Sequence, residues 1–180
     1  MVDYGPEVAL IVVDVQNDFA DPAGSLYVRG GEAVVAVANR EIERAVASGS
    51  AVFYTQDWHP PSTPHFKKDG GIWPVHCVGG TWGAELHPAL EVRGEVIRKG
   101  VAGEDGYSGF TVRDPGSGGQ IATVLASRLR EKGILRVVVM GLATDYCVLN
   151  TVRDARRLGF EVVLLTDAIS AVNVDPGDGP

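Results

Sequence analysis

Short apolar runs alternate along this 180-residue chain with segments of helical period, and this alternation constrains the fold more than any other feature. Val8–Val13 is an unbroken run of Val, Ala, Leu and Ile, which is typical of a strand buried on both faces. Residues 32–48 instead place four apolar side chains at helical spacing, and Gly49 is a suitable stop for that helix. Segments of these two kinds continue to alternate along the rest of the chain, apart from one long irregular segment.

Periodicity predicts further strands at residues 51–55, 95–98, 134–140 and 161–166, and further helices at residues 120–132 and 144–158. Strands that alternate with helices predict an α/β fold, a Rossmann-like doubly wound parallel sheet with helices on both faces. Because the sequence has no internal repeat or low-complexity linker, we expect one domain over residues 1–180. Residues 57–88 are irregular and rich in Pro, Gly, His and Trp, and so long a loop inside a compact domain is usually functional.

Charge and cysteine content exclude some functions. The net charge of -7 provides no basic surface for nucleic acid. The N-terminus carries Asp3 and Glu7 where a signal peptide needs positive charge, and Asp14 interrupts the first apolar run. Cys77 and Cys147 form no CxxC pair. Because no secretory signal is recognised, we expect free thiols in a cytoplasmic protein without a membrane partner.

Three reactive side chains follow the ends of predicted strands. Asp14 ends the first strand, Lys99 follows the third, and Cys147 comes just after the fourth. Ligand sites in open parallel sheets form beyond the carboxyl ends of the strands. Alone, Asp14 could cap a turn and Lys99 could be a solvated surface residue. Together with the thiol they supply a base, a cation and a nucleophile, the parts needed for covalent acyl transfer.

Cys147 lies in a turn that feeds a predicted helix, with Thr144 as the expected N-cap. The positive end of the helix dipole and the ammonium of Lys99 would both favour a thiolate there. Backbone N–H groups of Ala143 and Cys147 could bind an oxyanion in the same turn. A buried structural cysteine is the competing interpretation, and position alone leaves both open.

One carboxylate and three imidazoles gather in the irregular segment. They are Asp57, His59, His65 and His76. This donor set suits one divalent metal ion such as Zn, Fe or Mn, although exposed loop histidines are the simpler alternative. Three of the four histidines in the chain fall here. Cys77 is a weaker candidate ligand than His76, and His87 is interpreted as structural.

Taken together, these motifs resemble the isochorismatase-like cysteine hydrolases, and among them the nicotinamidases. The resemblance covers nearly the whole chain in order. The matching pieces are residues 13–19 (VDVQNDF), 56–59 (QDWH) with His65, 73–81 (WPVHCVGGT), 98–100 (RKG), 107–110 (YSGF) and 141–148 (GLATDYCV).

The resemblance implies roles for these residues. It implies a catalytic triad of Asp14, Lys99 and Cys147, and an oxyanion hole beside a cis peptide between Leu142 and Ala143. It also implies one metal ion that anchors the pyridine nitrogen and is held by Asp57, His59, His65 and His76. The side chains expected to contact the substrate ring are Phe19, Trp73 and Tyr107. Tyr146 stands where many nicotinamidases have His, and we expect it to shape the substrate pocket as well.

The implied activity is hydrolysis of nicotinamide to nicotinate and ammonia through a cysteine thioester, as in pyridine nucleotide salvage, with pyrazinamide as a second substrate. An alternative keeps the triad but takes another small amide, a carbamoyl or ureido compound; relatives of that kind lack the histidine cluster. Isochorismatase activity is disfavoured because that reaction needs no cysteine nucleophile. A metal-binding or scaffold protein without turnover is a third possibility.

The chain stops soon after the fifth predicted strand, at Asp178, Gly179 and Pro180. The family leads us to expect one more helix and strand there. Either the sequence is a piece of a longer chain, or another chain covers residues 161–180. The second case would make the protein a homo-oligomer.

Overall fold

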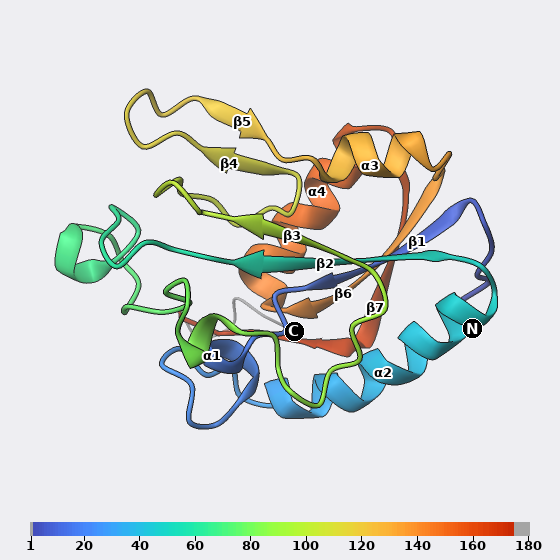
Figure 1. Ribbon diagram of the computed structural model, residues 1–180, viewed down its shortest axis with the longest axis horizontal. Coiled ribbons are helices and arrows are strands. Elements are labelled where there is room, and N and C mark those ends of the chain that lie inside the picture. The colour runs from blue at the N-terminus through green and yellow to red at the C-terminus, as the bar shows by residue number, and fades with distance from the viewer. Residues whose placement is uncertain (1, 175–180) are drawn as a thin grey trace.

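A five-stranded parallel sheet with the strand order β3-β2-β1-β6-β7 forms the centre of the protein (Figure 1). The computed structural model describes residues 2–174. Its elements are β1 (Val8–Val13), α1 (Asn17–Ala20), α2 (Gly31–Ala47), β2 (Ala51–Asp57), η1 (Lys67–Asp69), η2 (Trp82–Ala84), β3 (Glu95–Lys99), β4 (Thr111–Arg113), β5 (Gln120–Ala122), α3 (Leu125–Glu131), β6 (Arg136–Leu142), η3 (Thr144–Val148), α4 (Leu149–Arg157) and β7 (Glu161–Ser170).

Strand β1 is the central strand, and its side chains alternate between two hydrophobic cores. Leu10 and Val12 pack into the core beneath α2, whereas Ile11 and Val13 pack into the core beneath α3 and α4. Ile11 is in register with Phe53 of β2 and with a valine of β6, so every residue of β1 is buried. Helices therefore cover both faces of the sheet, which confirms the predicted doubly wound α/β fold (Figure 1).

The predicted helix at residues 120–132 is wrong in its first part. Gln120–Ala122 forms β5, which pairs antiparallel with β4, and the helix α3 begins only at Leu125. Thr123 explains the boundary. Its hydroxyl donates to the carbonyl of Gly109 and accepts from the N–H of Leu125, so the chain turns there before the helix starts.

The strands of the central sheet all end on the side of the molecule that carries the irregular segment (left in Figure 1). The two edges of the sheet are β3 and β7. The expectation about the end of the chain falls partly on residues 175–180, which lie outside the described residues. Within residues 2–174, no helix is long and apolar enough to cross a membrane.

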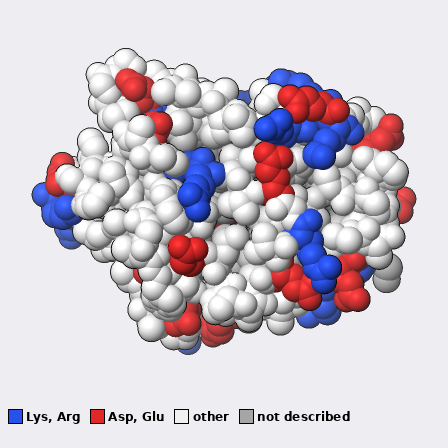
Figure 2. Space-filling view, viewed as in Figure 1, with Lys and Arg blue, Asp and Glu red and all other residues white. Residues whose placement is uncertain are grey.

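Charged side chains of both signs are interspersed on the face shown in Figure 2. The most prominent basic group on this face overlies α3 and is bordered by acidic side chains (Figure 2). Arg128 of α3 is paired with Glu95 at 3.1 Å and with Glu131 at 3.2 Å. These exposed pairs neutralise much of the local charge but contribute little to stability.

Candidate active site

The ends of β1 and β3 and the turn after β6 bring Asp14, Lys99 and Cys147 together. Nζ of Lys99 lies 2.9 Å from Oδ2 of Asp14 and 3.9 Å from Sγ of Cys147. All three side chains are buried. The parallel sheet thus assembles the three residues that sequence reasoning placed at strand ends.

Asp14 adopts a backbone conformation that side chains rarely tolerate, with φ of 47°. Thr55, on β2, holds it there. The Asp14 N–H lies 3.2 Å from both the carbonyl and the hydroxyl oxygen of Thr55, and that hydroxyl donates to Oδ1 of Asp14 at 2.6 Å. Strained non-glycine residues cluster at functional sites, where their surroundings fix them. Sequence reasoning missed Thr55 because a threonine inside a strand carries no distinctive signal.

The buried charges set the protonation states of the three groups. Burial raises the pKa of the Asp14 carboxyl, and nearby Lys99 only partly offsets this. Burial would lower the pKa of Lys99, but the carboxylates of Asp14 and Asp57 outweigh it and hold that pKa well above its usual range. Burial also raises the pKa of the Cys147 thiol, against the effect of Lys99. The resting side chain is therefore a thiol rather than the thiolate that the helix dipole suggested.

Cys147 lies in a single π-helical turn, Thr144–Val148, ahead of α4. Such turns often occur at functional sites. The predicted N-cap at Thr144 is wrong: its hydroxyl is buried without a hydrogen-bond partner, and Ala143 caps the turn through its carbonyl, which accepts from the N–H groups of Tyr146 and Val148. The peptide between Leu142 and Ala143 is cis, as the resemblance implies.

The three loop histidines converge. His59, His65 and His76 each offer a ring nitrogen, and these nitrogens lie within 4.8 Å of one another in a buried group. Asp57 stands between this group and the triad. One of its carboxylate oxygens contacts Nζ of Lys99, and the other lies 3.8 Å from Nε2 of His59.

The hydrogen bonds of the histidines fit a metal ion. Nδ1 of His76 lies 2.7 Å from the carbonyl of Pro74, and Nδ1 of His65 lies 2.6 Å from Oδ1 of Asp105, which leaves each Nε2 for the cluster. Neither ring nitrogen of buried His59 has a hydrogen-bond partner, which is unusual for a polar group. Burial lowers the pKa of His59 to about 4, so its ring is neutral and can act as a ligand.

Two residues support this group in ways that the sequence did not reveal. Gln16 brackets Asp57: its amide donates to the Asp57 carbonyl at 2.7 Å and accepts from the Asp57 N–H at 2.8 Å. Gly100 has φ of +78°, and a Cβ there would lie 2.6 Å from Nδ1 of His59. The short Arg-Lys-Gly motif therefore needs glycine so that the ring of His59 can fit.

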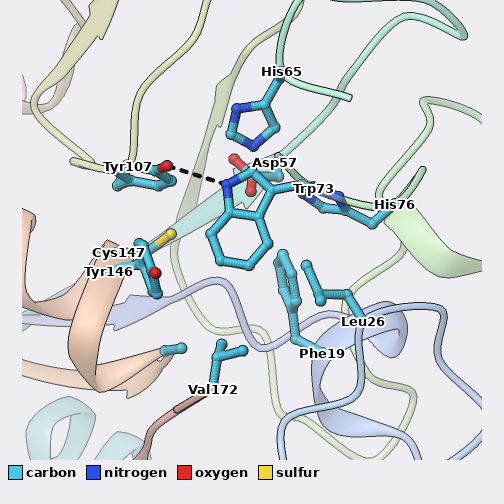
Figure 3. Close-up of a pocket in the computed structure, with 11 residues that line it drawn as sticks. Phe19, Leu26, Asp57, His65, Trp73, His76, Tyr107, Tyr146, Cys147 and Val172 are labelled. Atoms are coloured by element: carbon cyan, nitrogen blue, oxygen red, sulfur yellow. Dashed lines mark hydrogen bonds between the residues drawn. The ribbon is translucent and has the colours of Figure 1, made fainter. Parts of the chain in front are cut away.

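Aromatic side chains line a pocket in front of these groups (Figure 3). Trp73 donates through Nε1 to the hydroxyl of Tyr107 at 3.1 Å. Its ring packs edge-to-face against Tyr146, with 4.7 Å between the ring centroids. The four aromatic residues that we expected to contact the substrate all line this pocket. The lining comprises Phe19, Leu26, Asp57, His65, Trp73, His76, Tyr107, Ala143, Tyr146, Cys147 and Val172.

Leu26 and Val172 are the two lining residues that sequence reasoning missed, because apolar residues in irregular segments give no signal. Cys77 stays outside the histidine group. It is buried, its N–H donates to Asp18 at 2.7 Å, and its sulfur lies 3.9 Å from the carbonyl of Gly83. His87 is also apart from the cluster, with Nδ1 accepting from the N–H of Ala89 at 3.2 Å.

Known proteins are similar to this chain in sequence and in architecture. The isochorismatase domain matches residues 8–178. Nicotinamidase from Escherichia coli (strain K12) is 40% identical over 191 residues, which cover 96% of this chain and 87% of that protein. PnC1 from L. infantum in complex with nicotinate has a TM-score of 0.86 at 42% identity, covering 98% of this chain and 87% of its own. Pyrazinamidase of Pyrococcus horikoshii in complex with zinc has a TM-score of 0.84 at 41% identity, covering 96% and 90%.

Proposed function

The chain belongs to the isochorismatase family and is an amidohydrolase of the nicotinamidase type, and on this basis we propose that it hydrolyses nicotinamide to nicotinate and ammonia. One observation carries the proposal. A buried Asp–Lys–Cys group and a buried three-histidine group share Asp57 as their neighbour and border the same pocket. A nicotinamide molecule there would meet a nucleophile at its carboxamide and a ligand site at its ring nitrogen.

In the first half of the reaction, Sγ of Cys147 attacks the carboxamide carbon while Asp14 takes the thiol proton. Asp14 then gives that proton to the leaving ammonia as the C–N bond breaks and a thioester remains. In the second half, Asp14 takes a proton from water as the water oxygen attacks the thioester carbon. The C–S bond then breaks, Asp14 returns its proton to the sulfur, and the released acid gives its carboxyl proton to the solvent to become nicotinate. The raised pKa of buried Asp14 suits a group that must both accept and release a proton.

Lys99 stays protonated throughout and stabilises the negative charge that develops on sulfur, 3.9 Å away. The backbone N–H groups of Ala143 and Cys147 would bind the oxyanion of each tetrahedral intermediate. Both residues line the pocket, so the carbonyl oxygen of a bound amide can reach that turn. Removing one donor from such a site typically costs a factor of about 100–1,000 in kcat.

Asp57, His59, His65 and His76 would hold one divalent metal ion, and zinc is the first choice because the similar pyrazinamidase structure contains it. When bound, the ion supplies a Lewis-acid contact for the ring nitrogen of the substrate. Asp57 can serve both groups, with one oxygen toward Lys99 and the other toward the histidines. Phe19, Trp73, Tyr107 and Tyr146 would pack against the ring and exclude water from it.

An ammonia-release assay over a small panel of amides tests this function. We expect turnover of nicotinamide and pyrazinamide by the zinc-loaded protein, and a kcat/KM for benzamide lower by at least ~100-fold, because benzamide lacks the ring nitrogen that aligns the reacting carbon. Comparable values for nicotinamide and benzamide would contradict orientation by the metal. Turnover of a ureido or carbamoyl compound in preference to nicotinamide would favour the alternative amidohydrolase, and no turnover of any amide would favour a scaffold.

A further inference from the structure

A carboxylate outside the predicted ligand set contacts the histidine cluster. Asp105 lies in the loop between β3 and β4, and its Oδ1 is 2.6 Å from Nδ1 of His65. The ring of His65 is buried, whereas the Asp105 side chain is about one-third exposed, at 37%. Asp105 therefore lies at the outer rim of the cluster and contacts it through one histidine.

The loop around Asp105 fixes the position of this carboxylate. The N–H of Asp105 donates to the carbonyl of Arg113 at 2.9 Å, and the N–H of Arg113 donates back, so the residue is bridged to β4. Oδ1 also accepts the N–H of Gly106 at 2.8 Å. Thr63 donates to the carbonyl of Gly103 at 3.2 Å, which ties this loop to the one that carries His65. The carboxylate is thus placed by backbone contacts on both sides.

The geometry defines which ring nitrogen of His65 is available. A carboxylate at Nδ1 favours the tautomer that carries its proton there, so that Nε2 keeps its lone pair for the cluster. His76 has an equivalent contact, from Nδ1 to the carbonyl of Pro74 at 2.7 Å. The two partners differ in charge, and a carboxylate is the stronger acceptor of the two. The Asp105 contact should therefore hold the His65 ring more firmly than the Pro74 carbonyl holds the ring of His76.

We propose that Asp105 is a positioning residue of the metal centre, which orients His65 through its Nδ1–H and strengthens it as a ligand. The inference rests on the metal site of the proposed function. The loop that carries Asp105 also links the metal site to the substrate pocket, because Tyr107, two residues further along it, forms part of the pocket wall. Gly106 between them has φ of +136°, and a Cβ there would come within 3.2 Å of the backbone of Val112.

Zinc affinity of the metal-free chain, measured by competition with a chromophoric chelator, tests this role without any substrate. We expect Asp105→Ala to weaken zinc binding by about 10–100-fold, as is typical when such a partner of a ligand is lost. Asp105→Asn keeps an acceptor oxygen but loses the charge, so its loss should be smaller. The matched control is Asp114→Ala in the neighbouring exposed loop, where the carboxylate accepts from Ser117; it should leave zinc affinity unchanged.

Thermal unfolding of the metal-free variants separates positioning from a structural role. We expect Asp105→Ala and Asp114→Ala to unfold at similar temperatures while only the first loses zinc affinity. If Asp105→Ala does not fold, Asp105→Asn decides, and wild-type affinity in it would overturn the inference. Unchanged affinity in a folded Asp105→Ala would overturn it too, leaving the proposed function intact. A wild-type chain that binds no zinc would overturn both this role and the proposed metal site.

Discussion

Thr55 has more influence on the proposed chemistry than its place inside a strand suggests. Its hydroxyl donates a hydrogen bond to the carboxylate of Asp14 at 2.6 Å. That bond lowers the pKa of Asp14 and thereby opposes the effect of burial. It also fixes the direction of the carboxylate, since the same hydroxyl accepts the N–H of Asp14.

Thr55→Val should slow turnover while preserving the fold, because it removes this hydroxyl and keeps the shape. We expect kcat to fall by about 10–100-fold, in line with the cost of misplacing a reacting group. Without the bond the pKa of Asp14 rises, so the acid limb of the kcat/KM profile should shift to higher pH. The control is Thr111→Val, which breaks a similar bond to Asp154, 2.7 Å long and away from the site. Equal effects from both variants would rule out a specific role for Thr55.

At this scale the sequence was informative only where a residue type was rare or its position unusual. Asp14 and Lys99 could be predicted because a charged side chain at the end of a buried strand requires a partner. The histidines could be predicted because they are few and clustered. Thr55 and Asp105 could not, since threonine is common in strands and Asp105 is 40 residues from His65. Only folding shows that these loops meet.

The segment that follows β7 is the element whose role is least apparent from the sequence. Val172 lines the pocket although it lies beyond the end of the strand. Asp145, in the same turn as Cys147, accepts the N–H of Val172 at 3.1 Å and that of Asn173 at 2.8 Å. The turn that carries the nucleophile thus also holds one wall of the pocket.

Asp145→Ala should loosen this wall because it removes both acceptors. We expect hydrogen exchange at the amides of Val172 and Asn173 to become faster, while exchange in α2 stays as in the wild type. The KM for nicotinamide should rise by several-fold, because each lost hydrogen bond contributes only about 1 kcal/mol. Unaltered exchange at these two amides would show that other contacts hold the segment.

Elements with a single clear period were predicted with small errors at their ends. The buried strand β1 was predicted at its observed bounds, and α2 within one residue at each end. The hairpin β4–β5 was missed although Pro115 and three glycines mark its turn, because each strand has only three residues and Gln120–Ala122 leads directly into a helical pattern. The π-helical turn at Cys147 was also missed, since local sequence does not distinguish it from an α-helical start.

At the scale of the whole molecule, the parallel sheet gathers residues from β1, β2, β3 and the turn after β6 into one buried group. The region holds Asp14, Asp57, Lys99 and three histidines with little exposure to solvent. Both ring nitrogens of His59 are buried there without a hydrogen-bond partner, and such atoms destabilise a fold unless a ligand satisfies them. The formation of a homo-oligomer stays a prediction, which light scattering can test.

Metal removal should lower the stability of the whole chain because zinc would bind only the folded state. At a free zinc concentration about 1,000 times the Kd, the gain in the free energy of unfolding is about 4 kcal/mol. For a domain of this size we therefore expect a chelator to lower the Tm by about 10 °C in calorimetry. Restoring zinc should return the Tm. An identical Tm with and without a chelator would mean that the histidine group binds no metal in solution.

The central claim is that Cys147 is the nucleophile of a nicotinamide hydrolase, and its most direct test is ammonia release from nicotinamide by wild-type protein and Cys147→Ala. The substitution removes the sulfur and little volume, so both proteins should have the same circular dichroism spectrum and the same zinc content. We predict that the wild type releases ammonia and nicotinate in equal amounts, and that the variant loses turnover by a factor of at least about 1,000. A folded, zinc-loaded Cys147→Ala that kept a substantial share of the wild-type kcat would contradict the account.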